Sequence, residues 1–226
     1  MNFIIPNLKQ VKTNSALVVL AILIGLVVSV VAQSFIYLAK NIITTLKINH
    51  EGSLFSISIF DNSINIIPFL SCLFAALLIS LIIKISRIDR WYGPADTIYA
   101  SHLSTEKLDV KKGFLSSAAS FISISGGASV GLYGPLVHFG GTLAVYIKRF
   151  NFIPIIPHDI LIGSGVAAAI SAGFGSPLAG IIFAHEVVLR HFSMRAVTAI
   201  SLASVSASLT AIEMKLVSPF LKFDYQ

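Results

Sequence analysis

Charged residues and cysteine are both scarce in this sequence. Only 12% of its 226 residues are charged, 55% are hydrophobic, and one is a cysteine. Because soluble domains usually carry about 25% charged residues, the scarcity of charge excludes a cytosolic enzyme, a disordered chain and a coiled coil. The lone cysteine, Cys72, excludes a disulfide scaffold. The composition therefore predicts an all-α polytopic membrane protein, with the lipid bilayer as its main apolar surroundings.

Two long apolar segments have the length that a membrane-spanning helix needs, about 20 residues. The first is Ala16–Ala32, which extends to Lys40 and follows Lys9 and Lys12. The second is Ile64–Ile83. A basic start before an apolar run also fits a signal peptide, but the run is too long and no clean A-x-A cleavage site follows it.

The apolar stretches become shorter and richer in glycine, serine and alanine after residue 90. Breaks are predicted at Gly131–Pro135 and Gly173–Pro177. In a membrane, broken helices occur only where the freed backbone is buried in protein or lines a wet cavity, as in transporters and channels. The predicted helices or half-helices are Val110–Val130, Pro135–Ile147, Asp159–Gly173, Pro177–Leu189 and Ala196–Ile212.

The net charge of +6 raises the question of a nucleic-acid partner. With the N-terminus in the cytoplasm, twelve of the sixteen basic residues fall on the cytoplasmic side and four outside. This bias follows the positive-inside rule and accounts for the charge without nucleic acid. It predicts a multi-pass protein of the cell (inner) membrane with a cytoplasmic N-terminus. The four external residues are Lys40, Lys47, Lys215 and Lys222.

The strongest local motif is Gly126–Gly141, GGASVGLYGPLVHFGG, in which six of sixteen residues are glycine. Pro135 suits the first turn of a helix. Free N–H groups at such a helix start attract anions. The alternative is that the glycines serve only close helix packing, as small residues four apart such as Gly127 and Gly131 do.

A second motif is Gly163–Glu186, in which Glu186 is the only acidic residue placed well inside an apolar segment. It is either functional or a structural carboxylate paired with Arg190. A third segment, Arg90–Ala100 (RWYGPADTIYA), predicts a turn before a short helix that Asp96 helps to start.

No metal site, cofactor or enzymatic activity is expected from the remaining polar residues. The histidines lack metal-ligand spacing with carboxylates or cysteine, and the Ser and His residues lack the context of an intramembrane serine protease. The histidines considered are His138, His185 and His191.

Together these segments resemble the CLC family of chloride channels and chloride/proton exchangers. GLYGP at Gly131–Pro135, followed by LVHFGG, is similar to the family's GREGP segment and the V-Q-I-G-G type run after it. AAAISAGFGSPLAGIIFAHEVV resembles A-A-F-N-A-P-L-A-G-x-L-F-x-x-E-E, and RWYGPADTIYA stands where the family usually has GSGIPE. Their order and spacing agree over roughly residues 15–215, and a bacterial branch looks closest.

The resemblance implies two inverted-topology repeats around a midplane anion site, and a homodimer with one pathway per subunit. This chain then holds a cytoplasmic segment (1–14), the first CLC-like repeat with broken and re-entrant helices (15–215), and an external tail or linker (216–226). A second-half polypeptide is expected to supply the other repeat. Ala196–Ile212 resembles a dimer-interface helix with small residues on one face. The dimer-interface candidates are Ser201, Ser204, Ser208 and Ala211.

The resemblance also assigns the anion pathway to two turns and the helix starts after them. Backbone N–H groups there would hold an anion weakly at several points, which lets it leave as well as enter. Tyr92 aligns with the serine of GSGIPE, and its hydroxyl is an alternative donor. The pathway candidates are Tyr92, Gly93, Pro94, Ala95, Gly131, Leu132, Tyr133, Gly134, Pro135, Leu136 and Val137.

Both glutamates that carry protons in the family's exchangers are replaced. Tyr133 stands at the external gate position, after Leu132 in place of Arg, and Val187 follows Glu186 at the internal proton site. A phenol, with a pKa of about 10, does not readily alternate between charged and neutral forms at pH 7, and valine carries no proton. The sequence therefore predicts passive transport of chloride or a similar small anion, without proton coupling.

The alternative is a truncated or non-conducting CLC-like subunit that acts through helix–helix interaction. A pair of copies inserted in opposite orientations is disfavoured by the charge bias. Broken backbone exposed to lipid costs several kcal/mol per unsatisfied group, so the repeat is expected to need a partner.

Overall fold

The computed structural model describes residues 8–46, 56–59, 62–103, 108–149 and 156–216. The regular secondary structure of these residues is helical apart from one antiparallel hairpin, in which β1 (Ser56–Ile59) pairs with β2 (Asn62–Asn65). The helices are α1 (Leu8–Thr45), α2 (Ile67–Ser86), α3 (Pro94–His102), α4 (Val110–Ser125), α5 (Tyr133–Lys148), α6 (His158–Phe174), α7 (Pro177–Phe183), the π-helical turn η1 (Ala184–Leu189) and α8 (Met194–Met214). Residues 1–7 of the predicted cytoplasmic segment (1–14) and residues 217–226 of the predicted tail or linker (216–226) lie outside the described residues.

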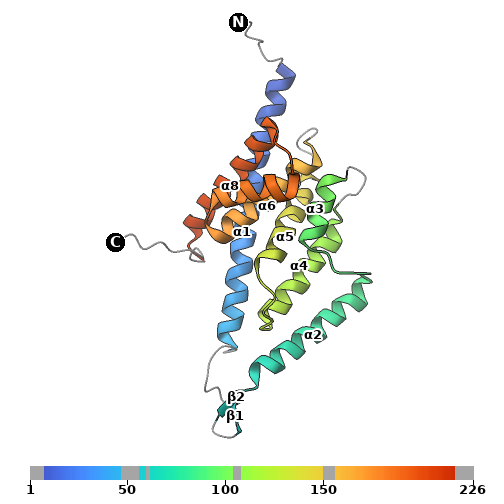
Figure 1. Cartoon of the computed structure of the whole chain (residues 1–226), viewed down its shortest axis with the longest axis vertical. Helices are drawn as coiled ribbons and strands as arrows, with labels where there is room; N and C mark the ends of the chain where they lie inside the picture. Colours follow the sequence, from blue (N-terminus) through green and yellow to red (C-terminus); the bar gives the residue numbers. More distant parts are fainter. Residues whose placement is uncertain (1–7, 47–55, 60–61, 104–107, 150–155, 217–226) are drawn as a thin grey trace, which may run out of the picture.

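Among the described residues, three helices are long and apolar enough to cross a membrane: α2, α8 and the Ser15–Thr45 part of α1. Of the most apolar window in α2, only 6% is buried within the chain, and its side chains Phe69, Leu73, Phe74 and Leu77 are exposed. Figure 1 shows α2 set apart from the helices around α6. An apolar helix left bare on its own chain is stable only in apolar surroundings, so the fold is that of a polytopic membrane protein.

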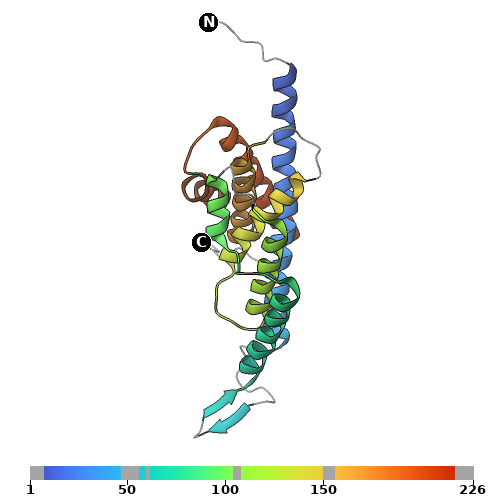
Figure 2. The same ribbon diagram turned by 90° about the vertical axis from the view of Figure 1, so that its right-hand side faces the viewer.

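Helix α6 forms the centre of the chain and packs against α1, α5, α7 and α8. Every residue from Ile160 to Gly173 is buried. Small side chains let its neighbours approach closely, most of all where Gly140 of α5 crosses Gly165 of α6. Figure 2 shows α1 running along most of the long axis beside this group.

Predicted and observed helix bounds agree within a few residues, except in α1 and at two other ends. Helix α1 runs from Leu8 to Thr45, beyond both ends of the predicted segment from Ala16 to Lys40. Helix α4 ends at Ser125 rather than Val130, because Gly127 adopts a positive φ of 96°, a conformation that suits glycine. Helix α2 begins at Ile67, with Pro68 in its first turn. Ile64, predicted to begin that helix, pairs with Ile57 in the hairpin instead.

The small-residue face of α8 is occupied within the chain, which corrects the predicted dimer interface. Ser204 is fully buried; its Oγ donates to the Pro177 carbonyl at 2.8 Å, and its own carbonyl accepts from Ser171 Oγ at 2.6 Å. Ser208 and Ala211 are also buried, and Ser201 is half-buried. The spacing correctly indicated a packing face, but that face packs against α1, α6 and α7.

Candidate functional site

The glycine-rich segment between α4 and α5 forms the first predicted break. Gly131 adopts a φ of 79°, and α5 begins at Tyr133, two residues before the predicted Pro135. Leu132, at the N-cap, makes no side-chain capping hydrogen bond. The first N–H groups of a helix lack intrahelical acceptors, so the start of α5 presents backbone donors and a partial positive charge.

Tyr133 is held against the second predicted break. Its ring stacks on Phe174, the last residue of α6, with centroids 3.9 Å apart and planes inclined by 20°. Gly173 leaves room for this ring, since a Cβ there would lie 3.2 Å from Tyr133 Cε1. The structure thus joins the two breaks, which lie some forty residues apart in the sequence, through an aromatic pair that the sequence did not indicate.

The side chain of Asp96, in the first turn of α3, caps the start of that helix. The Gly93 N–H donates to Asp96 Oδ2 at 2.8 Å, and Asp96 Oδ1 accepts from Arg90 Nη2 at 2.5 Å. The predicted role of Asp96 in starting the helix is therefore confirmed. This cap removes one predicted donor from the candidate anion pathway, because the Gly93 N–H already donates to the Asp96 carboxylate.

Tyr92 lies between two cationic side chains just before α3. Arg90 Cζ is 4.4 Å from the centroid of its ring. Lys112 Nζ is 3.4 Å from its hydroxyl oxygen, which therefore accepts from the ammonium and keeps its own proton to donate. The Tyr92 N–H donates to Ser116 Oγ at 3.0 Å, which fixes this residue against α4.

The starts of α3 and α5 lie side by side. A Cβ on Gly134 would lie 3.6 Å from Pro94 Cγ, an ordinary contact. One turn further in, Thr97 Oγ1 is 2.7 Å from His138 Nδ1. Two segments that the sequence proposed independently, around residues 93 and 134, therefore converge. Of the pathway candidates on α5, Leu136 and Val137 are buried in the core.

Thr97, His138 and Phe174 were not predicted as site residues. The signal for His138 was its place as a basic side chain within the apolar, glycine-rich run of α5, where any polar atom needs a partner. Phe174 gave no signal beyond its position next to a break.

The predicted internal proton positions lie on η1. Glu186 is exposed in this chain and Val187 is half-buried. The sequence offered an ion pair with Arg190 as the alternative role of Glu186. In the described part of the chain, these two side chains form no ion pair. Arg190 ends η1 with a φ of 57°, its N–H bonded to the His185 carbonyl, so the helix does not continue and the i, i+4 geometry that such a pair uses is lost.

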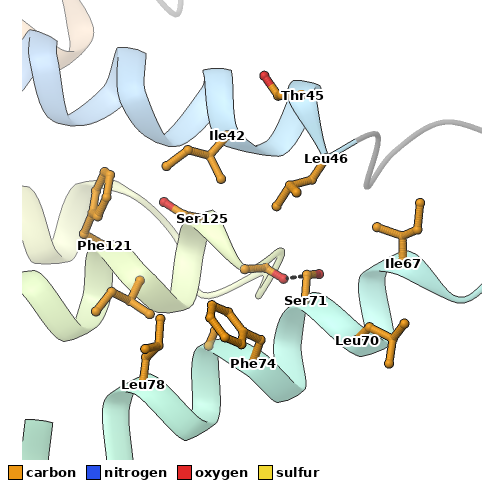
Figure 3. A pocket seen from close by; sticks show the side chains of 13 residues that line it. Ile42, Thr45, Leu46, Ile67, Leu70, Ser71, Phe74, Leu78, Phe121 and Ser125 are labelled. Atoms are coloured by element: carbon orange, nitrogen blue, oxygen red, sulfur yellow. Dashed lines mark hydrogen bonds between the residues drawn. The ribbon is translucent and has the colours of Figure 1, made fainter. Parts of the chain in front are cut away.

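An apolar groove of about 760 Å³ lies elsewhere, between the end of α1, α2 and the end of α4 (Figure 3). Ser71 of α2 donates to the Gly126 carbonyl at 2.8 Å and anchors α2 at its edge. The groove is lined almost wholly by apolar side chains, so it offers no site for an anion. No group of three or more metal-ligating side chains occurs among the described residues.

Comparison with known proteins identifies a family and several relatives that are similar to this chain in sequence. The sequence profile of the family "Voltage gated chloride channel" matches residues 71–225. The voltage-gated ClC-type chloride channel ClcB of Yersinia pestis is 28% identical over 120 residues, 52% of this chain and 28% of that protein. H(+)/Cl(−) exchange transporter 7 of Mus musculus is 31% identical over 78 residues, 29% of this chain and 10% of that protein.

Among solved structures, the crystal structure of a slow cyanobacterial Cl−/H+ antiporter superposes with a TM-score of 0.67 at 19% identity. The match covers 88% of this chain and 47% of that one, and shows a shared fold. The chain spans about a quarter of the length of the bacterial relatives it matches. The profile match covers more than half of the chain, and the chain belongs to the voltage-gated chloride channel family.

Proposed function

We propose that this chain forms the first repeat of a CLC-type pathway for chloride or a similar small anion across the cell membrane, and that it is a transport protein and not an enzyme. The observation that carries the proposal is the meeting of the starts of α3 and α5. These helix starts come from the two motifs that resemble the family's anion-binding segments. Family membership supports the choice of a chloride-sized anion over other solutes.

In this proposal the anion is held mainly by the start of α5. Backbone N–H groups at the uncapped helix end supply partial positive charge, and the Tyr92 hydroxyl is a further donor. Arg90 is tied to Asp96 and lies over the Tyr92 ring, so no lone buried cation faces the anion. Binding by several weak donors lets an ion leave as readily as it enters.

We further propose that transport is passive. Relatives of this chain are named both as channels and as exchangers, so their names do not decide between passive and coupled transport. Two residues of this chain favour the passive mechanism. By the sequence resemblance, Tyr133 and Val187 stand where the family's exchangers have their two proton-carrying glutamates. The Tyr133 ring is also held by Phe174, which opposes the swinging motion that a gate side chain would need.

The proposed assembly contains a second-repeat polypeptide and two pathways, in a membrane with the chain's N-terminus in the cytoplasm. The twelve-to-four distribution of basic residues supports this orientation. The exposed apolar face of α2 also fits the alternative, a non-conducting subunit that acts by helix–helix contact.

Flux in native membranes tests the proposal, because those membranes also contain the partner chain that the pathway requires. Vesicles from cells that express the chain should release chloride faster than vesicles from cells that lack it, and a plasmid copy should restore the rate. Equal rates would refute transport and favour the non-conducting subunit. Uphill proton movement driven by a chloride gradient would refute the passive mechanism alone. Tyr133→Glu should make the flux depend on pH, whereas a pH-independent flux in that variant would place Tyr133 off the pathway.

A further inference from the structure

The apolar groove between α1, α2 and α4 is a second candidate binding site, apart from the anion pathway (Figure 3). Its volume of about 760 Å³ falls within the range of about 300–1,000 Å³ that is usual for small-molecule sites. Helix α2 is bonded to α4 beside it, because Ser71 and Cys72 both donate to the Gly126 carbonyl, at 2.8 and 3.3 Å. The groove therefore lies next to a packed contact, rather than between unconnected helices.

The length of the groove matches one leaflet of a bilayer. Its lining residues on α2 recur every three or four positions from Ile67 to Leu78 and so form one face of the helix. These two residues are eleven positions apart, about 16 Å along the helix axis. This is about half of the ~30 Å thickness of the hydrocarbon core.

One end of the groove lies where two spanning helices end. Helix α1 ends at Thr45 and α2 begins at Ile67, and both residues line the groove. Spanning helices end near the polar boundary of the bilayer. The groove therefore runs from that boundary toward the middle of the membrane.

The groove is continuous with the surface of α2 that faces lipid. Leu70 and Phe74 line it, yet 52% and 63% of their surfaces remain exposed on this chain. Helix α2 makes its main helix contact with α4, and among the described residues α1 and α2 make few direct contacts. The space between α1 and α2 is therefore open to the same acyl chains that surround the bare side of α2.

Ser125 adds a polar feature to this otherwise apolar groove. It lines the groove, its side chain is directed from α4 toward α1 (Figure 3), and it is only 6% exposed. Its hydroxyl has no hydrogen-bond partner within the part of the chain that the structure describes. Buried hydroxyl groups without partners are rare in proteins, so an occupant that supplies an acceptor explains this one.

We propose that the groove binds one acyl chain of a membrane phospholipid, and that Ser125 donates a hydrogen bond to the ester carbonyl of that chain. The ester then lies at the polar end of the groove, and the hydrocarbon runs past Phe121 and Phe74 toward Leu78. A helix of another chain fits less well, because its backbone acceptors are already bonded within the helix. The bound chain fills the space between α1 and α2. This inference does not rest on the proposed anion site.

The test compares two lipids that differ only in the predicted acceptor. The full chain is purified, stripped of lipid in detergent, and titrated with dipalmitoyl phosphatidylcholine or with its dihexadecyl ether analogue, which lacks the carbonyls. Native mass spectrometry gives the Kd for the first lipid bound. The ester lipid should bind about two- to tenfold more tightly, as one net hydrogen bond provides. Equal Kd values would overturn the proposal without any variant.

Three variants locate the bound lipid. Ser125→Ala should bind both lipids with the Kd of the ether lipid, and its Tm should not fall, because its hydroxyl bonds to no described residue. Leu70→Trp fills the groove and should raise the Kd at least about fivefold. Leu73→Trp is the matched control: Leu73 is 51% exposed on the same helix but does not line the groove, so the Kd should not change. Equal weakening by both tryptophans would mean that lipid binds the general surface of α2, and would overturn the proposal.

Labelling in native membranes tests whether lipid occupies the groove when the chain's own partners are present. Cells that express the chain are fed a palmitic acid that carries a photoactivatable diazirine, and are then illuminated. Mass spectrometry should find the label on residues 67–78 of α2 and 121–126 of α4. Labels on other apolar surfaces but none on these two segments would show that another polypeptide covers the groove, and would overturn the proposal. None of these measurements involves chloride, so the lipid site and the anion pathway can be refuted separately.

Discussion

The crossing of α5 and α6 gives the sharpest test of how the site is held. At Gly140 an added Cβ would lie 2.5 Å from the Gly165 carbonyl oxygen and 2.7 Å from Ala169 Cβ. Optimal separations between carbon atoms are about 3.5–4.0 Å, so Gly140→Ala must push the two helices apart by roughly 1 Å. Because α5 carries both Tyr133 and His138, the change also displaces the site.

The expected loss of stability in Gly140→Ala is the difference between an overpacking penalty and a gain in helix propensity. Overpacking a close interface costs about 1–3 kcal/mol, and the upper value applies here because one of the clashing atoms belongs to the backbone of the buried helix α6. Alanine recovers up to ~1 kcal/mol over glycine in a helix. The net loss is about 2 kcal/mol, which corresponds to a fall in Tm of ~4–8 °C for a chain of this size.

Gly134→Ala is the matched control, because it places the same methyl group on the same helix. Its Cβ would meet only Pro94 Cγ, at 3.6 Å, so the helix-propensity gain should leave Tm unchanged or slightly raised. Thermal unfolding of the detergent-solubilised chain, followed by size-exclusion chromatography of the heated samples, measures both variants. If Gly140→Ala unfolds within a degree or two of Gly134→Ala, the backbones of α5 and α6 are not in contact and the reasoning fails.

Three further changes test other parts of the structure. Asp109 accepts from the Lys111 and Lys112 N–H groups at the start of α4, so Asp109→Ala should lower stability by about 1 kcal/mol in the same thermal assay, and Asp109→Asn by less. Phe174→Leu removes a stacking partner worth about 0.5–1.5 kcal/mol and should alter chloride flux, whereas Tyr133→Phe keeps the stack and should leave the flux unchanged. Ser204→Leu should prevent recovery of folded chain, because Ser204 is fully buried against α7, whereas Leu209→Ala on the exposed side of α8 should give normal yield.

Most helices were predictable from the sequence, because length and glycine or proline punctuation decide where an apolar helix begins and ends. The break before α5 and the start of α3 both follow from local chemistry, namely positive φ at Gly131 and the cap supplied by Asp96. The hairpin was missed although its signal is local. Ser56–Ile59 alternates polar and apolar residues, a pattern typical of a strand.

Contacts between segments that are distant in the chain could not be predicted from the sequence. The serines of α8 share a face, and that spacing indicates packing, but only the structure shows that α1, α6 and α7 provide the surface it meets. The same limit applies to the site. Each helix start could be predicted from its own motif, whereas the Tyr133–Phe174 stack and the Thr97–His138 bond depend on how the helices cross.

The two helix starts are not equivalent, although the sequence treats them alike. At α3 the first N–H is bonded to a carboxylate of the same helix, so an anion placed there would approach a negative charge and compete for an occupied donor. At α5 no side chain of the described residues caps the helix, so its first N–H groups carry no such competing charge. Backbone dipoles favour an anion at both starts, but the Asp96 carboxylate opposes it at the start of α3. The proposed anion is therefore expected at the start of α5 rather than at the start of α3.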